Sequence, residues 1–581
     1  MPEGNDSRLL GVTKYQFFCS FLAALGTLNF GWNIGSVNIP GGVIQNCDAG
    51  PRRYNGHFPS CLPTNQYAWG VVVGSFALGA MGGAIAASKF SNHFGRKPTL
   101  FWGSLFSVAG AVFLSTTTSR GQFILGRVCT GIQAGSATAS VAAYIGEITT
   151  PKARTTMGTM LQLSINVGIF ASSAAAMGLT RPPLWRPLLS LTALFSGITM
   201  IGIPFAVESP KWLMSKGRIE ECQAALTKLR KGADISEEMN DLIQASREEN
   251  AEDSIKATTV WQLLRGKTPH NLRHQLMVIS FLMFFQQFSG INAVIFYSTS
   301  IVNRIRPTNP ANIPTTAQII AMSISATAMV FTVVALFLIH FFGRRPLLLF
   351  SHGSMCISCL CLALGSYYNV SAWVILMVYL FNIFFNFGAG PLPWASAAEM
   401  TPGYAIGAMT SIGNSINFFF TFVIGVIFLP IQTGLKNLTF LFFMGWNLAA
   451  FVFIFFFLPE TKNRRVEDVV RVHSTGIHFI FGRHVPVIED VEHKDVLPRS
   501  ADGEENIESP SSSSPSSGHS YTELGEHDIR EKSHSLGGAP GVPSPTMMRR
   551  QGDDDDDDGG GSTTRNSDHA QEHVPSLPKA E

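Results

Sequence analysis

Long apolar windows alternate with short polar breaks over most of this chain. Windows of about 20 apolar residues have the length at which a helix crosses a bilayer. They recur near residues 15–38, 67–88, 99–117, 122–144, 157–178, 187–206, 275–302, 316–340, 346–366, 371–394, 407–430 and 438–458. The pattern predicts an all-α polytopic membrane protein with twelve transmembrane helices. Only 14% of the residues are charged and the mean hydropathy is +0.20, which fits that class.

Two polar segments fall outside these windows. The segment between the sixth and seventh windows is too polar to span, and residues 219–230, the neighbourhood of Arg247 and residues 261–264 have the spacing of short amphipathic helices. After about Val466 the chain is polar and ends in low-complexity sequence, so we expect it to be disordered. The predicted organisation is a cytosolic N-terminus (1–14), a first six-helix half (15–207), a cytosolic helical linker (208–273), a second six-helix half (274–465) and a disordered cytosolic tail (466–581).

An internal repeat supports the division into two halves. The Phe-Gly-Arg-Lys-Pro sequence around Gly95 recurs as Phe-Gly-Arg-Arg-Pro around Gly343, 248 residues later. Glu147 and Glu208 have counterparts in Glu399 and Glu460, each 252 residues later and in a similar local sequence. Three pairs at nearly one offset indicate duplication of a six-span unit. Two parallel six-helix halves are typical of transporters whose substrate lies between halves that rock.

The charges and sequons indicate which loops are cytosolic. An even number of spans places both termini on one side, and most loop lysines and arginines fall on that side, as the positive-inside rule requires of the cytosol. The sequon at Asn369 falls outside and predicts glycosylation there, whereas Asn437 lies too close to the membrane. Cys47 and Cys61 share one outer loop and are a candidate disulfide, although the sequence does not require that they pair.

Three amide side chains stand in an otherwise apolar part of the seventh window. They are Gln286, Gln287 and Asn292, and on an ideal helix they would not share one face. Gly290 lies between them, and a helix break there would bring them together, as in the discontinuous helices of transporter binding sites. An unpaired amide in a bilayer costs several kcal/mol, so such groups usually face a cavity or another helix. The alternative is that they only join helices.

Charged residues gather at the predicted cytosolic ends of the spans. Arginine donates to carboxylates in a forked geometry, so these groups are candidates for a latch that joins the halves when the site faces outward and opens when it faces inward. Single exposed pairs contribute only about 0–1 kcal/mol, so the alternative is a set of solvated charges that anchor the topology. The latch candidates are Gly95, Arg96, Lys97, Arg127, Glu147, Arg154, Glu208, Gly343, Arg344, Arg345, Glu399 and Glu460.

Together these motifs resemble the sugar porter family of the major facilitator superfamily, and most of all its facilitative glucose transporters. The likeness rests on the two Gly95 and Gly343 loops, Gly126-Arg127, Glu147 with Arg154, Glu208-Ser-Pro-Lys211, Gln286-Gln287-Phe-Ser-Gly-Ile-Asn292, Gly388-Ala-Gly-Pro391-Leu-Pro-Trp394 and Pro459-Glu460-Thr-Lys462. It covers about residues 15–468 and leaves only the tail outside.

The resemblance implies a hexose between the halves, held by amides and an indole. Sugar hydroxyls donate and accept hydrogen bonds, as amides do. The implied substrate-binding residues are Gln162, Gln286, Gln287, Asn292, Asn386, Trp394, Asn417, Thr421, Asn38 and Phe30, and the implied outer gate is Tyr297 with Phe296. Several positions depart from the family: Asn386 replaces a glutamate, Ala328 an asparagine, Thr421 an amide, Phe418 a tryptophan and His340 an acid, while Val207 and Asn463 break the usual loop motifs. These changes bear on substrate identity more than on fold.

Asn33 stands where proton-linked relatives carry an aspartate. An amide does not titrate, so the resemblance implies passive uniport. Carriers of another polyol, proton-coupled carriers and a transport-deficient sugar sensor that signals through the tail remain alternatives. No catalytic triad, metal cluster or phosphate loop occurs in the sequence, so we expect no enzyme activity and no cofactor.

The expected partners are the sugar and the lipid bilayer, without nucleic acid, and the tail is a candidate binder of cytosolic proteins. The net charge of +2 says little about partners because charge is segregated by segment. The plasma membrane is the expected location. An acidic dileucine-like sequence that ends at Leu9-Leu10 would instead direct the protein to an endosomal or vacuolar membrane.

Overall fold

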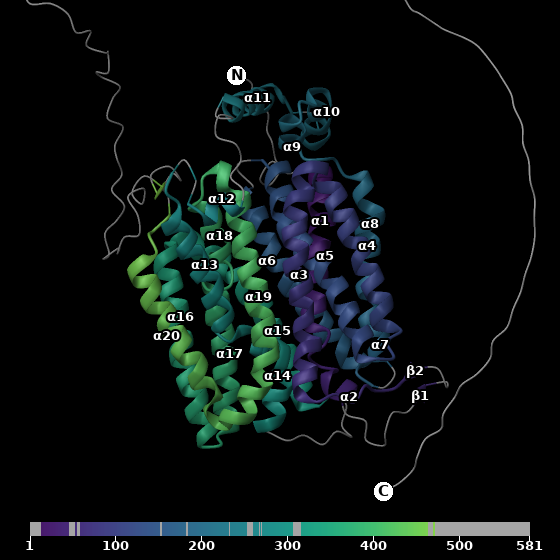
Figure 1. The fold of residues 1–581 in the computed structure, drawn as a ribbon, viewed down its shortest axis with the longest axis vertical. Coiled ribbons are helices and arrows are strands. Elements are labelled where there is room, and N and C mark those ends of the chain that lie inside the picture. The colour runs from purple at the N-terminus through teal and green to yellow at the C-terminus, as the bar shows by residue number, and fades with distance from the viewer. Residues whose placement is uncertain are drawn as a thin grey trace, which may run out of the picture. The chain divides into compact units, whose positions relative to one another are not determined.

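A computed structural model describes most of the chain up to residue 470 (Figure 1). The described residues are 13–45, 53–54, 58–150, 154–181, 184–231, 233–251, 260–266, 268, 270–305, 315–462 and 469–470. All lie in the first of two units, residues 1–494. Of the predicted disordered tail (466–581), Val469 and Val470 are helical and buried, so the prediction is wrong there, and the rest lies outside the described residues.

Each of the twelve predicted spans coincides with one helix or with a broken helix pair. In the first half these are α1 (Lys14–Gly35), α3 (Gln66–Phe94), α4 (Arg96–Ser115), α5 (Arg120–Ile148), α6 (Arg154–Leu179), and α7 (Trp185–Ser190) with α8 (Thr192–Gly202) and the 3-10 turn η2 (Ile203–Phe205). In the second they are α13 (Arg273–Phe288) with α14 (Ile291–Ile305), α15 (Thr316–Phe341), α16 (Arg344–Tyr367), α17 (Ser371–Phe387) with α18 (Leu392–Glu399), α19 (Gly403–Leu435), and α20 (Thr439–Phe457).

By length and hydropathy, ten segments among the described residues are long and apolar enough to cross a membrane. The difference from twelve has two causes. Helix α5 is not among the ten, and it carries Arg120, Arg127 and Glu147 besides many small residues. Helices α19 and α20 count as one segment of 53 residues because only the turn η4 (Lys436–Leu438) separates them.

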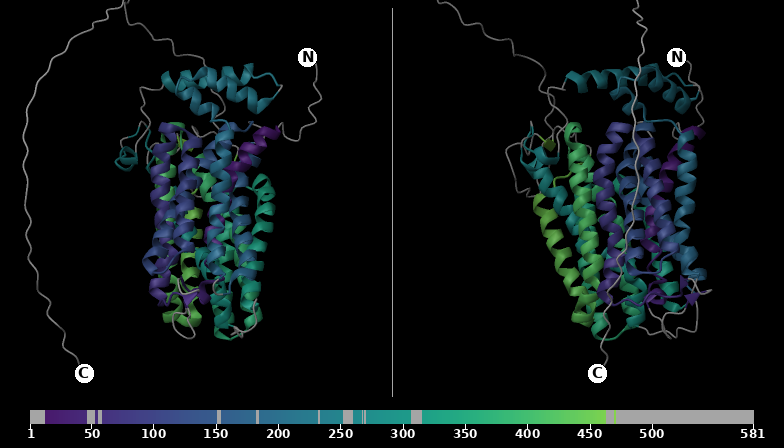
Figure 2. Two further views of the ribbon diagram at one scale, coloured as in Figure 1. Left: turned by 90° about the vertical axis from the view of Figure 1, so that its right-hand side faces the viewer. Right: turned by 45° about the vertical axis from the view of Figure 1, so that its right-hand side comes forward.

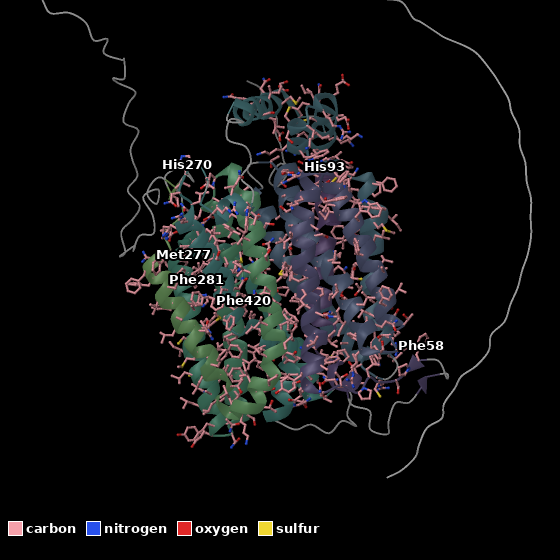
Figure 3. The ribbon with its side chains drawn as sticks, in the orientation of Figure 1. Phe58, His93, His270, Met277, Phe281 and Phe420 are labelled. Carbon is pink, nitrogen blue, oxygen red and sulfur yellow. The ribbon has the colours of Figure 1, made fainter. Side chains whose placement is uncertain are left out.

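Three short elements lie beside the spans at one end of the bundle. They are α2 (Gly41–Gln45) and the paired strands β1 (Arg53–Tyr54) and β2 (Phe58–Pro59). Figure 3 marks the two ends: His93 lies at the end of α3 near the linker, and Phe58 lies at the other.

The linker forms four helices, and three of them cover one end of the first half (Figures 1 and 2). These three are α9 (Pro210–Ser215), α10 (Ile219–Arg230) and α11 (Ser236–Ala251), and α12 (Val260–Leu264) follows. The predicted amphipathic helices at 219–230, around Arg247 and at 261–264 are thus confirmed. Arg230 fixes the linker to the bundle, since its guanidinium donates to the backbone oxygen of Ile148 (3.0 Å) and to Oε1 of Gln16 (3.2 Å). It also joins α10 to α11 by its pair with Glu238 (2.6 Å). We call this end the linker side, which the sequence assigns to the cytosol, and the other end the opposite side.

Small residues allow the helices to approach closely. A Cβ added at Gly83 of α3 would overlap the backbone oxygen of Ile132 in α5, and one at Gly135 of α5 would overlap the backbone oxygen of Ala80 in α3. Lipid tails are as apolar as the side chains, so association of helices in a membrane depends on such packing rather than on hydrophobic burial. The α3–α5 contact therefore tolerates glycine and little else.

In the second half aromatic rings provide the packing. Phe284 of α13 lies 4.7 Å from Phe420 of α19 and 5.2 Å from Trp446 of α20, measured between ring centroids. Both pairs are edge-to-face, an arrangement that aromatic quadrupoles favour. Figure 3 shows Phe420 with Phe281, another ring of this cluster. The cluster holds α13 against two neighbours immediately before the position where α13 ends.

The α3–α5 packing can be tested with two adjacent glycines. We expect Gly83→Ala to destabilise the protein by roughly 1–3 kcal/mol, because the added methyl group forces the two backbones apart. Gly82→Ala, where a Cβ meets no atom within 4 Å, is the matched control and should be neutral or slightly stabilising. Melting of the purified variants in detergent measures both, and equal melting temperatures would contradict the account.

Candidate functional site

The helix break predicted at Gly290 is present. Helix α13 ends at Phe288 and α14 begins at Ile291, and Gly290 between them has a φ of +100°. This backbone region is open to glycine and strained for residues that carry a Cβ. A Cβ at Gly290 would also lie 2.9 Å from the ring of Phe443. Backbone conformation and neighbouring packing thus both favour glycine at the break.

The break brings the three amides together. Gln287 and Asn292 are hydrogen-bonded to each other through Oε1 and Nδ2, and Nε2 of Gln287 donates to Oε1 of Gln286 (3.3 Å). Helix α19 adds two more predicted residues: Asn417 donates to Oε1 of Gln286 (2.6 Å) and the Thr421 hydroxyl to Oε1 of Gln287 (3.0 Å). All five side chains are buried, so they form one polar cluster inside an apolar bundle.

A second helix break meets the first. Helix α17 ends at Phe387 and α18 begins at Leu392, which leaves the backbone oxygens of Ala389 and Gly390 without a helical partner. Nε2 of Gln286 donates to both, at 2.7 and 2.8 Å. The same short helix α18 carries Trp394. The seventh and tenth predicted spans are therefore joined by one glutamine.

A cavity of about 900 Å³ extends from this cluster to the linker side. At its linker end it is lined by Arg96, Glu147, Lys211 and Glu238. Nine of the ten predicted substrate-binding residues line it: Phe30, Gln162, Gln286, Gln287, Asn292, Asn386, Trp394, Asn417 and Thr421. The predicted gate residue Phe296 also lines it.

The tenth residue, Asn38, lies elsewhere and helps to close the opposite side. It donates to the hydroxyl of Ser298 (2.6 Å) and accepts from the hydroxyl of Thr299 (3.2 Å), so it joins α14 rather than the cavity wall. We therefore correct its predicted position. The sequence could not show this, because a polar residue at the end of a span can face either the cavity or the facing half.

Tyr297, predicted to be a gate residue, packs against α19 of its own half, and its gating role stays a prediction. It has non-helical angles (φ −131°, ψ 17°) within α14, and its hydroxyl donates to the backbone oxygen of Gly425 (2.6 Å). Its ring stacks on Phe428 at 5.2 Å. These contacts lie within the second half, whereas the Asn38 bond and the close approach of Gly70 of α3 to Val426 of α19 join the two halves on the opposite side, and the cavity reaches the linker side.

The carboxylates predicted for the latch bind inside each half. Glu147 pairs with Arg96 (2.7 Å), and Glu208 accepts from the backbone N–H of Arg96 (2.9 Å) and of Lys97 (3.1 Å) at the start of α4. A carboxylate is stabilised there by unpaired N–H groups and by the helix dipole. Burial nevertheless raises the pKa of Glu208 above its ordinary value, while three backbone N–H donors and Arg96 oppose the shift.

The second half repeats this arrangement. Glu399 pairs with Arg344 (2.8 Å), and Glu460 accepts from the backbone N–H of Arg344 (2.9 Å) and of Arg345 (3.2 Å) at the start of α16. Within the described residues each of these bonds joins partners of the same half. A latch between the halves stays a prediction for a state that is closed on the linker side.

Arg127 does not belong to this set, and its predicted position was wrong. Helix α5 runs from the opposite side to the linker side, so Arg127 in its second turn lies near the opposite side. Its guanidinium is fully buried, donates to the backbone oxygens of Asn33 (2.7 Å) and Val73 (3.2 Å), and lies 4.6 Å from the ring of Phe76. The side chain of Arg154, another latch candidate, lies outside the described residues.

Other predictions concern the opposite side. Cys61 is disulfide-bonded, but its proposed partner Cys47 lies outside the described residues, so the pairing stays a prediction. Asn369 is exposed in the turn before α17, where a glycan would be accommodated. Its glycosylation also stays a prediction.

Sequence reasoning missed several buried polar residues near the site. Asn447 of α20 donates to the backbone oxygen of Ser289 (3.0 Å), next to the Gly290 break, and His352 of α16 contacts the Asn447 oxygen (3.1 Å). Asn166 of α6 bonds to Thr332 of α15 (2.5 Å). A polar side chain inside an apolar window was the available signal, but it does not identify a partner 95 or 166 residues away.

Comparisons with known proteins agree with this geometry. A family model described as "Sugar (and other) transporter" matches residues 19–473. The human "Solute carrier family 2, facilitated glucose transporter member 3" is 30% identical over 479 residues, which cover 80% of this chain and 94% of that protein. The rice "Sugar transport protein MST4" is 28% identical, and the match covers 79% of this chain and 90% of the rice protein.

Solved structures share the fold. The xylose transporter XylE from E. coli in a partially occluded inward-open conformation has a TM-score of 0.62 at 20% identity, and the match covers 78% of this chain and all of that one. The proton:xylose symporter XylE bound to 6-bromo-6-deoxy-D-glucose has a TM-score of 0.64 at 19% identity, with 79% and 99% covered.

The pair of Arg96 and Glu147 gives a test by charge reversal. We expect Arg96→Glu and Glu147→Arg each to destabilise the protein by about 2 kcal/mol or more, because like charges then meet at a half-buried helix end. The double variant should recover at least about 1 kcal/mol of that loss. Arg218→Glu, which breaks an exposed pair with Glu221, is the control and should change the melting temperature much less. Additive losses in the double variant would contradict a direct contact.

Proposed function

The chain belongs to the sugar transporter family, and on this premise we propose that it carries a hexose across the membrane as a passive uniporter. The observation that carries the proposal is the cavity that joins the buried amide cluster to the linker side, while α1 and α3 contact the second half on the opposite side. A solute that reaches the cluster from the linker side meets a closed path beyond it. This is what one of the two end states of an alternating-access carrier requires.

The chemistry of the cluster suits a neutral, polyhydroxylated ligand. Amide groups on four predicted spans, the fifth, seventh, tenth and eleventh, offer both donors and acceptors, and Trp394 offers an indole face for the apolar side of a sugar ring. Each hydrogen bond exchanged with water contributes only about 0.5–1.5 kcal/mol net. Such a site binds weakly and releases quickly, which suits a carrier.

Rocking of the halves would exchange the two sides. The contacts of Asn38 and Gly70 with the second half would open, and the linker-side ends would close. The carboxylates that cap α4 and α16 hold Arg96 and Arg344 at these ends in the same way in both halves. We propose that the closed state brings these ends together.

Uniport is favoured by where the charges lie. The carboxylates that line the described cavity, Glu147, Glu238 and Asp241, belong to its linker end, and Asn33 takes the place of a first-span aspartate. Asn33 donates to the backbone oxygen of Asn29 (2.8 Å) and accepts from Thr192 (3.2 Å), as a structural amide does. A proton relay at mid-depth would need a titratable group there. The related human protein is named a facilitated transporter, which is in keeping with this proposal.

Counterflow in proteoliposomes tests the substrate. We expect a purified, reconstituted chain to exchange labelled D-glucose-like hexoses in preference to pentoses and polyols. Gln287→Ala and Trp394→Ala should each lower exchange at least tenfold, because each leaves buried partners unpaired or removes the ring contact. Gln122→Ala, which removes a glutamine from the outer end of α5, is the control and should exchange as the unaltered protein does. Binding without exchange would favour a sensor, and folded protein that exchanges no sugar would refute a hexose carrier.

Uptake against a gradient tests uniport. We expect labelled hexose inside the vesicles to reach the outside concentration and no more, with or without an inward proton gradient, because no described cavity residue at mid-depth titrates. Addition of a protonophore should leave the plateau unchanged. Accumulation above equilibrium that collapses on protonophore addition would show proton coupling instead.

A further inference from the structure

A buried amide of the first half, Asn166, is bonded across the cavity to the second half. Its Nδ2 donates to the hydroxyl of Thr332 on α15 (2.5 Å) and to Oδ1 of Asn386 on α17 (3.1 Å). The three side chains are 5%, 2% and 3% exposed. Within the described residues, Asn166 is thus the point where α6 contacts two helices of the other half through one amide.

The hydrogen-bond network fixes which way the Asn166 amide points. Nδ2 of Asn386 donates to the backbone oxygen of Asn382 (2.7 Å), and a backbone oxygen can only accept. The oxygen of Asn386 must therefore accept the hydrogen bond, and the nitrogen of Asn166 must donate it. The assignment of the amide thus follows from a chain of donors that ends on the backbone.

This leaves the oxygen of Asn166 for the cavity. No described residue donates to it, and it is not among the enclosed polar atoms that have no partner. Asn166 lines the cavity, as does Gln162 four residues earlier, so the two lie on one face of α6. Two of the acceptors of the second half, the glutamine oxygens of the cluster, are already used. Oε1 of Gln286 accepts from Gln287 and Asn417, and Oε1 of Gln287 accepts from Asn292 and Thr421, which fills both lone pairs of each oxygen.

We propose that Asn166 is a further substrate-contacting residue that selects a sugar by accepting a hydrogen bond from one of its hydroxyls. The inference rests on the proposed hexose transport and adds a residue to that site. Thr332 and Asn386 are positioning residues, since they hold the nitrogen of the amide and so direct its oxygen to the ligand. A sugar without the matching hydroxyl leaves this acceptor unpaired and binds less tightly.

A deoxy-sugar scan tests the proposal. Inhibition of D-glucose counterflow by the 1-, 2-, 3-, 4- and 6-deoxy analogues gives, for each position, the ratio of the analogue's inhibition constant to that of D-glucose. This ratio does not depend on how much of the protein folds. In the unaltered chain we expect one or more positions to carry a penalty. Asn166→Val, which has no acceptor, should raise the KM for D-glucose about three- to tenfold and abolish the penalty at one position while keeping the others.

The control is Ser173→Ala, which removes another contact between the same two helices, the Ser173–Ser325 hydrogen bond (3.3 Å). It should leave the pattern of penalties unchanged. Thr332→Val, which removes a positioning hydroxyl, should reduce the same penalty that Asn166→Val abolishes. If Asn166→Val does not fold, Asn166→Ala, which also has no side-chain acceptor, is measured in the same way, with the same expectation.

Two results would overturn the proposal, and they are distinguishable. If the unaltered chain exchanges D-glucose but Asn166→Val keeps every penalty, Asn166 does not contact the substrate while the proposed function stands. If the folded, unaltered chain exchanges no sugar, the proposed function fails and this inference fails with it.

Discussion

An amide buried in a bilayer costs several kcal/mol unless another group bonds to it, and the second half of this protein is arranged around that cost. Gln286 satisfies its nitrogen with the two backbone oxygens left free where α17 ends, and its oxygen with Asn417 and Gln287. The broken helices and the amides thus satisfy each other. Neither would be stable alone, because an open helix end in a membrane has the same deficit as an unpaired side chain.

The mutual dependence explains why the site lies where the helices are interrupted. A continuous helix has no free backbone groups in its middle, so it offers nothing to an amide on a neighbour. The break at Gly290 has a left-handed backbone packed against Phe443, and Asn447 with His352 supports the adjacent carbonyl of Ser289. The aromatic cluster around Phe284 holds the preceding helix in place. The site is therefore held by packing on one side and by hydrogen bonds on the other.

The two halves have the same helix cap and the same ion pair at their linker-side ends. In each, a glutamate from a distant loop caps the first turn of a helix, and a second glutamate binds the arginine of that turn. Such caps fix the direction in which a span leaves the membrane. Because the cap and the ion pair are duplicated, the linker-side ends of the two halves have similar structures. A symmetric rocking motion needs this geometry.

The number and class of the spans, the linker helices, the repeat and the break at Gly290 could all be predicted from the sequence. These follow from local causes: apolar length, amphipathic spacing, and a glycine among amides. It also gave the residues that line the cavity, mainly through a family resemblance. It misplaced Arg127 and Asn38, because polarity in a span says that a partner exists and not on which side that partner lies.

Which polar side chains are hydrogen-bonded to each other can be seen only in the three-dimensional fold. Asn166 and Thr332 are 166 residues apart and stand on helices of different halves, so no local pattern relates them. The direction of the Asn166 amide depends in turn on Asn386 and on a backbone oxygen of α17. Hydrogen bonds are short-ranged and directional, so they depend on where two residues lie in space. The length of an apolar segment, in contrast, depends only on consecutive residues of the chain. The fold could therefore be predicted from the sequence, and the pairing inside it could not.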